Sequence, residues 1–288
     1  MTIQIGADDP VLLRNTCLRN LRLRIRGNPR LCVGVWEDLL MSLLNRIGYK
    51  ITHLSKFPRG NLIASMRNLA ARGFAPNHII DVGANKGSWS RDARAIFPDC
   101  GFTLIEPQVE MKKHLDRFCR GRDNCQWILG GAAEKNGRMT FTVCPNTVSS
   151  RFNVPASQAR RAGFAQREVP VFTLDHIVEN YVKTVPDIVK IDAEGFEQRV
   201  LQGSRSLLGK TELVFLEAHM ICDDDDPCSL IELTRVMSDF GYAPYDFTWF
   251  GKLPRHNGAI GLCEVAFAKK QGVLRQSMPS QAAKVRAA

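Results

Sequence analysis

The most informative part of the sequence is a short apolar run that ends in an acid and then turns through glycines: Ile79-Ile80-Asp81-Val82-Gly83-Ala84-Asn85-Lys86-Gly87. It predicts a strand, a tight turn and a helix over residues 89–96. Glycine lets the backbone take a positive φ and approach a ligand closely. The free N–H groups and the positive dipole end of the following helix attract polar groups of a ligand. The stretch therefore indicates an α/β fold with a ligand site at the end of a strand.

The spacing of these glycines argues against a dinucleotide site, which favours Gly-x-Gly-x-x-Gly. Counted from Gly83, that pattern requires glycine at positions 85 and 88, where the chain has Asn85 and Ser88. Asp81 would also repel a pyrophosphate, whereas it suits a cofactor with a cationic amino-acid end. S-adenosylmethionine is such a cofactor.

A second acid, Glu106, ends the apolar run of residues 102–106, 23 residues after Gly83. A carboxylate there can accept hydrogen bonds from both hydroxyls of a ribose. Either acid alone could be a helix cap or a surface group, but the joint strand–turn–helix–strand pattern predicts a nucleoside-type cofactor. The predicted cofactor-binding residues are Asp81, Gly83, Ala84, Asn85, Gly87, Glu106, Pro107 and Asp192.

Short apolar runs alternate with amphipathic segments from residue 76 onwards, which predicts a mainly parallel sheet with right-handed crossovers. The expected strands are residues 78–82, 102–106, 127–130, 187–192, 213–218 and 262–268. The expected helices between them are residues 89–96, 110–119, 198–208 and 230–240. Two further β-like pieces, 139–144 and 169–172, flank the polar residues 145–167, which we expect to form a long loop or an insertion over the site.

Polar side chains also gather where two of the expected strands end. The strand period of two places Lys190 and Asp192 on one face, and Glu194 opens the next helix. Glu217 and His219 share a face of the neighbouring strand. Each has a structural alternative: an acid at a helix start, a lysine–aspartate ion pair, or a histidine bonded within the scaffold. Polar groups are nevertheless costly to bury, and folding alone does not explain several of them at adjacent strand ends. They therefore indicate a binding or catalytic site.

From about residue 77 to 270 the chain resembles the FkbM-type S-adenosylmethionine-dependent methyltransferases. The matching stretches are residues 80–87 (IDVGANKG), 171–175 (VFTLD), 189–197 (VKIDAEGFE), 200–204 (VLQGS) and 216–217 (LE). The resemblance implies a Rossmann-like sheet of seven strands, mainly parallel, with the last strand antiparallel. It also implies methyl transfer to a hydroxyl, on acceptors that include polyketides and the sugars of surface or secreted glycoconjugates. One departure is Gly130-Gly131-Ala132-Ala133-Glu134, where we expect a polar residue near the adenine.

We therefore predict an S-adenosylmethionine-dependent O-methyltransferase that acts on a sugar hydroxyl, with a polyketide or other small molecule as the alternative acceptor. A hydroxyl is a poor nucleophile and needs a general base or a metal. His219 is the first candidate base, because its ordinary pKa lies near neutrality, and Asp192 is the second. The predicted catalytic set is His219, Asp192, Glu217, Glu194 and Lys190.

A hard divalent cation, Mg²⁺ or Mn²⁺, is an alternative to the base. Its oxygen ligands would be Asp192, Glu194 and Glu217. We favour the base and assign no metal ligand. Contacts with the acceptor are predicted from residues 145–167, through Ser149, Ser150 and Arg151.

The domain organisation is predicted from the change in the spacing of apolar residues along the chain. Residues 1–75 are expected to be a helical extension, residues 76–270 the methyltransferase domain and residues 271–288 a disordered tail. The acidic run 223–226 is expected to be a solvated loop.

Composition narrows the class of protein further. With 44% hydrophobic and 24% charged residues in 288, the chain is an ordinary globular protein, and no apolar run approaches the ~18 residues of a membrane-spanning helix. Nine cysteines, an odd number without C-x-x-C spacing, predict reduced thiols and a cytoplasmic location.

The formal net charge of +10 is concentrated near the two ends of the chain. The arginines of the N-terminal segment are expected to face solvent, with contact to an anionic membrane or a subunit interface as alternatives. We expect no nucleic-acid partner, and the oligomeric state stays open. An NAD-dependent oxidoreductase and a non-catalytic nucleotide-binding protein are the alternatives from other classes.

Overall fold

The computed structural model describes residues 60–223, 225–252 and 258–276. The chain divides into two compact units, Met1–Pro58 and Arg59–Ala288, and all described residues belong to the second. The expectation for the arginines of the N-terminal segment, and that of a helical extension as far as residue 59, lie outside the described residues. Among the described residues, no helix is both long and apolar enough to cross a membrane.

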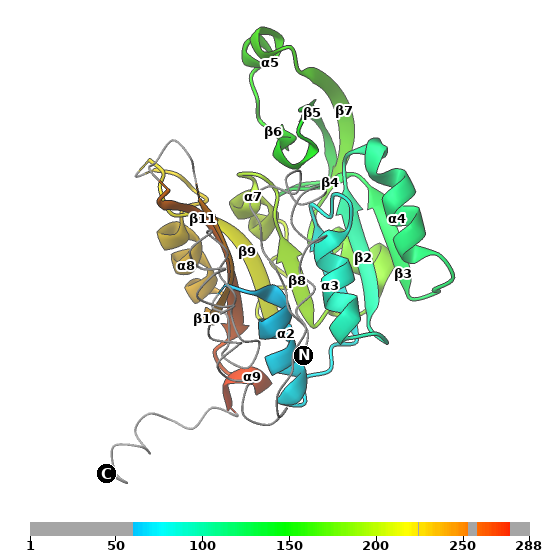
Figure 1. Cartoon of the computed structure of the whole chain (residues 1–288), viewed down its shortest axis with the longest axis vertical. Coiled ribbons are helices and arrows are strands. Elements are labelled where there is room, and N and C mark those ends of the chain that lie inside the picture. The colour runs from blue at the N-terminus through cyan, green and yellow to red at the C-terminus, as the bar shows by residue number, and fades with distance from the viewer. Residues whose placement is uncertain (1–59, 224, 253–257, 277–288) are drawn as a thin grey trace, which may run out of the picture. The chain divides into compact units, whose positions relative to one another are not determined.

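A seven-stranded sheet with the strand order β10-β11-β9-β8-β1-β2-β3 forms the centre of the unit (Figure 1). Neighbours from β9 to β3 are parallel, whereas β11 runs antiparallel to both β9 and β10. The strands are β1 His78–Val82, β2 Gly101–Glu106, β3 Cys125–Leu129, β8 Ile188–Ile191, β9 Leu213–His219, β10 Tyr242–Lys252 and β11 Ile260–Lys269. The predicted seven-stranded, mainly parallel Rossmann-like sheet is confirmed.

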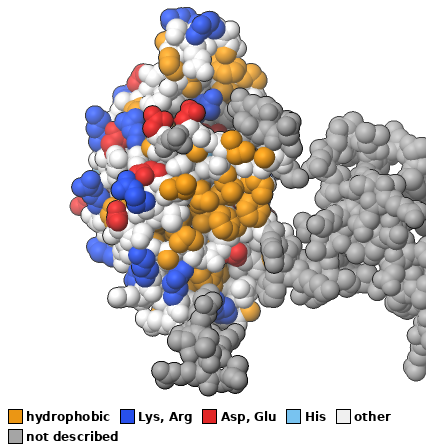
Figure 2. All heavy atoms as spheres, turned by 90° about the vertical axis from the view of Figure 1, so that its left-hand side faces the viewer, with side chains coloured by type: hydrophobic (Ala, Val, Ile, Leu, Met, Phe, Trp, Pro, Cys, Tyr) orange, Lys and Arg blue, Asp and Glu red, His pale blue; other side chains and the backbone are white. Residues whose placement is uncertain are grey.

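The edge strand β10 is the one member of this sheet that the apolar pattern did not reveal. Its pairing with β11 shifts register between Pro244 and Asp246, between Phe247 and Trp249, and again before Lys252. These bulges interrupt the alternation of apolar and polar residues on which sequence prediction depends. Apolar side chains gather on this side of the molecule (Figure 2), and Trp249 is 45% exposed.

Helices pack on both faces of the sheet, which is why most residues of its inner strands are apolar. Alternate residues of β1 show the two sides: Ile79 belongs to the cluster that includes α2, α3, α4 and α9, whereas Ile80 belongs to the cluster that includes α6, α7 and α8. The helices are α2 Leu62–Ala71, α3 Ser88–Ile96, α4 Lys112–Cys119, α5 Ala156–Ala162, α6 Leu174–Ile177, α7 Glu197–Gln202, α8 Leu230–Asp239 and α9 Val273–Gln276.

A second, four-stranded sheet stands beyond the carboxyl ends of β1, β2 and β8 (Figure 1). Its order is β4-β7-β5-β6, with β4 Gly131–Ala132, β5 Gly137–Val143, β6 Arg151–Phe152 and β7 Ala165–Phe172. The predicted β-like pieces 139–144 and 169–172 correspond to β5, which ends one residue earlier at Val143, and to the end of β7. Residues 145–167 are an insertion over the site but not a long loop, because they contain β6, α5 and the start of β7.

Two further expectations differ from the structure. The beginning of the predicted disordered tail forms α9, where Leu274 is 3% exposed and its N–H donates to the Glu212 carboxylate. Helix α2 was assigned to the N-terminal extension, but its residues Met66 and Leu69 are fully buried in the core beside the sheet. Burial of these apolar side chains explains why both helices belong to the compact unit.

Candidate functional site

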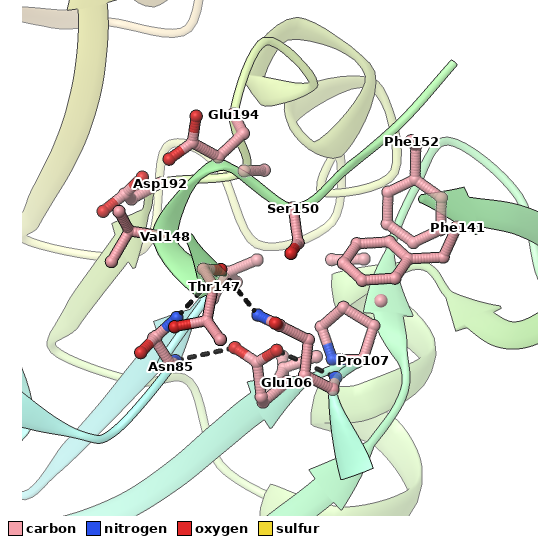
Figure 3. Close-up of a pocket in the computed structure, with 17 residues that line it drawn as sticks. Asn85, Glu106, Pro107, Phe141, Thr147, Val148, Ser150, Phe152, Asp192 and Glu194 are labelled. Atoms are coloured by element: carbon pink, nitrogen blue, oxygen red, sulfur yellow. Dashed lines mark hydrogen bonds between the residues drawn. The ribbon is translucent and has the colours of Figure 1, made fainter. Parts of the chain in front are cut away.

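A cavity lies at the carboxyl ends of β1, β2 and β8, between the central sheet and the second sheet (Figure 3). The sheet order places β1 between β2 and β8, so three strand ends open into one space. Of the predicted cofactor-binding residues, Gly83, Asn85, Glu106, Pro107 and Asp192 line it. The remaining three, Asp81, Ala84 and Gly87, lie outside this lining.

The turn after β1 runs very close to the turn after β8. Gly83 has φ 73°, and a Cβ placed on it would lie 1.8 Å from the carbonyl oxygen of Asp192. Only glycine fits this crossing, because any side chain would both strain the backbone and collide with the neighbouring loop. The crossing holds Asp192 at the edge of the cavity. Gly87 also has a positive φ, 73°, and caps the start of α3.

Glu106 is the carboxylate on the floor of the cavity and is 2% exposed. Its two oxygens accept hydrogen bonds from the backbone N–H groups of Asn85, at 2.6 Å, and Gln108, at 2.9 Å. Burial raises the pKa of Glu106, although these hydrogen bonds oppose the rise. The glycine turn and the end of β2 are thereby tied together through a single side chain.

The segment that precedes β6 forms the opposite wall of the cavity. The carbonyl oxygen of Thr147 accepts one hydrogen bond from the Asn85 side chain, at 3.2 Å, and one from the Gln108 side chain, at 3.0 Å (Figure 3). Phe141 and Phe152 pack edge-to-face beside this wall, with ring centroids 5.0 Å apart. Asn85 was predicted, whereas sequence reasoning missed Gln108, Phe141, Thr147 and Phe152. Of these four, only Gln108 could have been suggested by its position, two residues after the predicted site residue Glu106.

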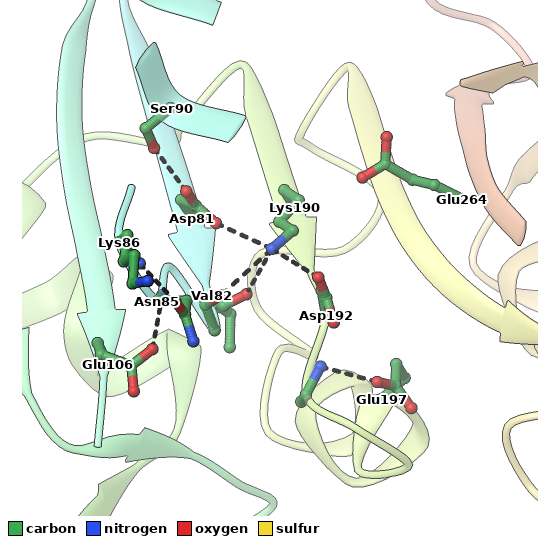
Figure 4. A network of polar contacts seen from close by, with 12 residues as sticks. Asp81, Val82, Asn85, Lys86, Ser90, Glu106, Lys190, Asp192, Glu197 and Glu264 are labelled. Atoms are coloured by element: carbon green, nitrogen blue, oxygen red, sulfur yellow. Dashed lines mark hydrogen bonds and ion pairs between the residues drawn. The ribbon is translucent and has the colours of Figure 1, made fainter. Parts of the chain in front are cut away.

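Lys190 is the centre of a buried polar network at the ends of β1 and β8 (Figure 4). Its ammonium lies 3.3 Å from the Asp81 carboxylate and 3.1 Å from that of Asp192. Ser90 also donates to Asp81, at 2.5 Å. Burial opposes the charge on Lys190, but the two carboxylates outweigh it and raise its pKa. Lys190 therefore stays charged and positions both aspartates, and it does not line the cavity. The ion-pair alternative predicted its pairing with Asp192 but not with Asp81.

The carboxylates of Asp192, Glu194 and Glu217 form an acidic cluster in which one oxygen of each lies within 4.8 Å of the others. Burial, reinforced by Asp192, raises the pKa of Glu194 to about 7. Burial, reinforced by Asp192 and then Glu194, raises the pKa of Glu217 to about 9. Glu197 supports the turn, because its carboxylate accepts from the N–H of Ala193 at 2.8 Å. The oxygen donors of this cluster match what Mg²⁺ or Mn²⁺ requires, as the metal alternative supposed.

His219 lies two residues beyond Glu217 on β9, where the strand period places both on one face. Its Nδ1 lies 2.6 Å from the carboxylate of Asp226, whose other oxygen accepts from the backbone N–H of Cys228 at 2.8 Å. Burial opposes ionisation of Asp226, but the hydrogen bonds from His219 and Cys228 lower its pKa overall. The prediction that residues 223–226 form a solvated loop is wrong for Asp226, because this carboxylate is paired with His219. The sequence alone does not show which residue an acid in a charged run will contact.

The three predicted acceptor contacts occupy different environments where the chain enters β6. Ser150 lines the cavity, and its hydroxyl accepts from the N–H of Cys144 at 2.9 Å. Ser149 is partly exposed beside Asn146, and Arg151 is exposed at the start of β6. Contact of the three with an acceptor stays a prediction.

Comparison with known proteins decides the family. Residues 81–244 match the family described as the methyltransferase FkbM domain. The chain belongs to the FkbM methyltransferase family. This confirms the resemblance predicted from the sequence and makes the protein a methyltransferase with S-adenosylmethionine as its cofactor. The alternative that the protein is an NAD-dependent oxidoreductase is therefore wrong. A comparison with curated protein sequences finds no match.

Solved structures resemble this FkbM methyltransferase only distantly. The 1,6-didemethyltoxoflavin N1-methyltransferase of Burkholderia thailandensis is 12% identical, with a TM-score of 0.37 over 86% of this chain and 93% of that one. The precorrin-6y C5,15-methyltransferase of Geobacter metallireducens is 14% identical, with a TM-score of 0.38 over 73% and 87% of the two chains. Fibrillarin from Aeropyrum pernix is 12% identical, with a TM-score of 0.38 over 75% and 77%.

The cavity of the FkbM methyltransferase fits its cofactor in chemistry. Glu106 offers carboxylate oxygens where ribose hydroxyls need acceptors. One buried side-chain oxygen in its wall, Oε1 of Gln108, has no hydrogen-bond partner, and a buried polar atom is normally paired. The carboxylate of Asp192 at the other end of the cavity suits a cationic amino-acid group.

Proposed function

We propose that this FkbM methyltransferase transfers the methyl group of S-adenosylmethionine to a hydroxyl of a sugar in a surface or secreted glycoconjugate. The observation that carries the proposal is the His219–Asp226 pair, which follows the acidic cluster at the end of β9. Two members of that cluster, Asp192 and Glu194, line the cavity. Asp192 and Glu194 thus offer hydrogen-bond acceptors in the cavity wall. Glu217 and His219 are not part of that lining, and the strand period puts His219 on the same face of β9 as Glu217, the third member of the cluster.

The cofactor supplies a methyl group on a cationic sulfur, and the chain must align that carbon with the acceptor oxygen. In our proposal Glu106 accepts from the ribose hydroxyls and fixes one end of the cofactor. Asp192 at the other end attracts the amino-acid group and favours positive charge nearby. Lys190 holds Asp192 in place from behind, at 3.1 Å.

His219 is the base that we propose for the acceptor hydroxyl. With Nδ1 held by Asp226, the Nε2 atom would receive the proton, and the carboxylate would stabilise the imidazolium that results. Asp192 stays the second candidate base. A divalent cation on the acidic cluster is the alternative route to an activated hydroxyl.

The negative charge around the cavity favours an acceptor with hydroxyl groups and without phosphate. Carboxylates are strong acceptors for the hydroxyls of a sugar. The same carboxylates repel phosphate, which argues against nucleic acid as the acceptor. Preference for a sugar over a polyketide hydroxyl comes from the family resemblance, and the assay below separates the two.

Titration calorimetry with S-adenosylhomocysteine tests the cofactor site. We expect Glu106→Gln to weaken binding about 100-fold, because glutamine keeps one acceptor oxygen and loses one hydrogen bond to a charged acceptor, at a cost of roughly 1.5–3 kcal/mol. Glu179→Gln, on an exposed residue after α6, is the matched control and should bind like the native protein. Equal binding by both variants would remove Glu106 from the proposed site.

A transfer assay with labelled S-adenosylmethionine tests the reaction. Methyl glycosides, secondary alcohols of polyketide type, amines and RNA serve as parallel acceptors, and we expect label in the glycosides. Asp226→Asn should lower kcat at least tenfold and displace the acidic limb of its pH profile, with little change in KM for the cofactor. Label in amines or RNA would refute O-methylation of a sugar, and label in the alcohols alone would select the polyketide alternative.

A further inference from the structure

Two cysteine side chains approach each other at the start of the edge strand β3, whereas the cavity lies at the carboxyl ends of β1, β2 and β8. Cys119 ends α4 and Cys125 begins β3, and their Sγ atoms are 3.0 Å apart. Both are free thiols of intermediate exposure. The separation is about 1 Å longer than a disulfide bond, which measures about 2.05 Å. A small movement of the turn between α4 and β3 would therefore bring the sulfurs to bonding distance.

A cation is fixed against one of these sulfurs. The guanidinium of Arg94, in the last turn of α3, donates from Nη2 to Sγ of Cys125 at 3.1 Å. The same group donates from Nη1 to the carbonyl oxygen of Phe118 at 2.6 Å and lies 3.3 Å above the Phe118 ring. These contacts orient Arg94 on Cys125 rather than into solvent.

The surroundings make the two thiols unequal. The hydrogen bond shared with Cys119 lowers the pKa of Cys125, and Arg94 and Arg122 lower it further against the effect of burial. The same shared hydrogen bond and then burial raise the pKa of Cys119. Asp116 also faces Cys119 and disfavours its thiolate. A thiol whose pKa is lowered, 3.0 Å from a second thiol, is an arrangement suited to exchange with disulfides.

We propose that Cys119 and Cys125 are a dithiol site that a small organic disulfide oxidises to an intramolecular disulfide bond. The thiolate of Cys125 attacks one sulfur of the small disulfide, forms a mixed disulfide and releases one small thiolate. Cys119 then gives its proton to solvent, and its sulfur attacks Sγ of Cys125 and releases the second small thiol. The two cysteines lose two electrons and two protons, and the small disulfide gains them.

Peptide mapping of the full-length protein after incubation with oxidised glutathione tests the site. Free thiols are alkylated in acid, and the protein is digested with trypsin without reduction. Trypsin cuts after Arg120 and Arg122, so the bond would join residues 118–120 to residues 123–135. We expect this linked pair as the main product, and fully buried Cys263 should be recovered alkylated.

Two single variants separate a dithiol site from a chance approach of two thiols. In Cys119→Ser, Cys125 should accumulate as a mixed disulfide, and at pH 7 it should react about tenfold faster than in the urea-unfolded variant. In Cys125→Ser, Cys119 should stay unmodified. Absence of the linked peptides in the folded native protein would overturn the proposal. Faster modification of Cys119 than of Cys125 would overturn the assigned order of attack and the role of Arg94.

Discussion

Replacement of Glu217 by glutamine should stabilise the protein increasingly as the pH rises. Burial and the carboxylates of Asp192 and Glu194 raise the pKa of Glu217 to about 9. The folded chain therefore keeps a proton on Glu217 at neutral pH, while the unfolded chain releases it near the ordinary value of 4.5. Stability from this group is fully present below the unfolded pKa and is lost as the pH rises towards the folded one. Glutamine resembles the protonated acid and has no charge to lose.

The size of the effect follows from the difference in bound protons. Where only the folded chain holds the proton, stability falls by a little over 1 kcal/mol for each pH unit. Between about pH 5 and pH 8 the upper limit is thus roughly 4 kcal/mol. Relaxation of the site and proton sharing within the acidic cluster reduce it, and we expect about 2 kcal/mol in favour of Glu217→Gln at pH 8.

Urea unfolding at pH 5, 6, 7 and 8 measures this difference directly. The native protein, Glu217→Gln and Glu179→Gln should have similar stabilities at pH 5. At pH 8 only Glu217→Gln should rise above the other two. A gap between Glu217→Gln and the native protein that does not change with pH would refute the reasoning, because a packing effect carries no proton dependence.

Three further outcomes are expected. Lys190→Met should cost at least about 3 kcal/mol in urea unfolding or abolish folding, because Asp81 and Asp192 would lose their buried counter-ion; native-like stability would contradict the network. Gly83→Ala should lower the melting temperature and abolish S-adenosylhomocysteine binding by calorimetry, whereas Gly121→Ala, at φ 72° with open space around its Cβ, should keep binding. Removal of divalent cations with EDTA should change the methyl-transfer rate less than twofold, and a large loss restored by Mg²⁺ would move the activating role from His219 to the acidic cluster.

Much of the fold could be predicted because its strands are buried on both faces. The expected strand 78–82 coincides with β1 His78–Val82, where three of five residues are apolar and the glycine turn follows directly. The acids Glu106 and Asp192 were predicted at strand ends, and parallel topology alone brings such ends to one edge. The family match over residues 81–244 includes both of these acids.

The cavity wall from the second sheet and the partner of His219 could not be predicted, because they depend on contacts between different segments of the chain. Phe141 and Phe152 line the cavity because the second sheet folds over it, and no spacing along the chain encodes that closure. Asp226 sits in an acidic run, and its role emerges only when the loop places it on His219. The bulges of β10 broke the alternation that reveals a strand.

The carbonyl oxygen of Thr147 joins the two sides of the cavity, since it receives both the Asn85 and the Gln108 side chains. A wall fastened at one oxygen can swing out at a cost of about two ordinary hydrogen bonds, roughly 1–3 kcal/mol. That free-energy cost is smaller than the cost of breaking a strand pairing of the central sheet, where several hydrogen bonds would be lost together. We therefore expect exchange of the cofactor to require movement of the segment before β6 only, with the strands that hold Glu106 and Asp192 in unchanged register.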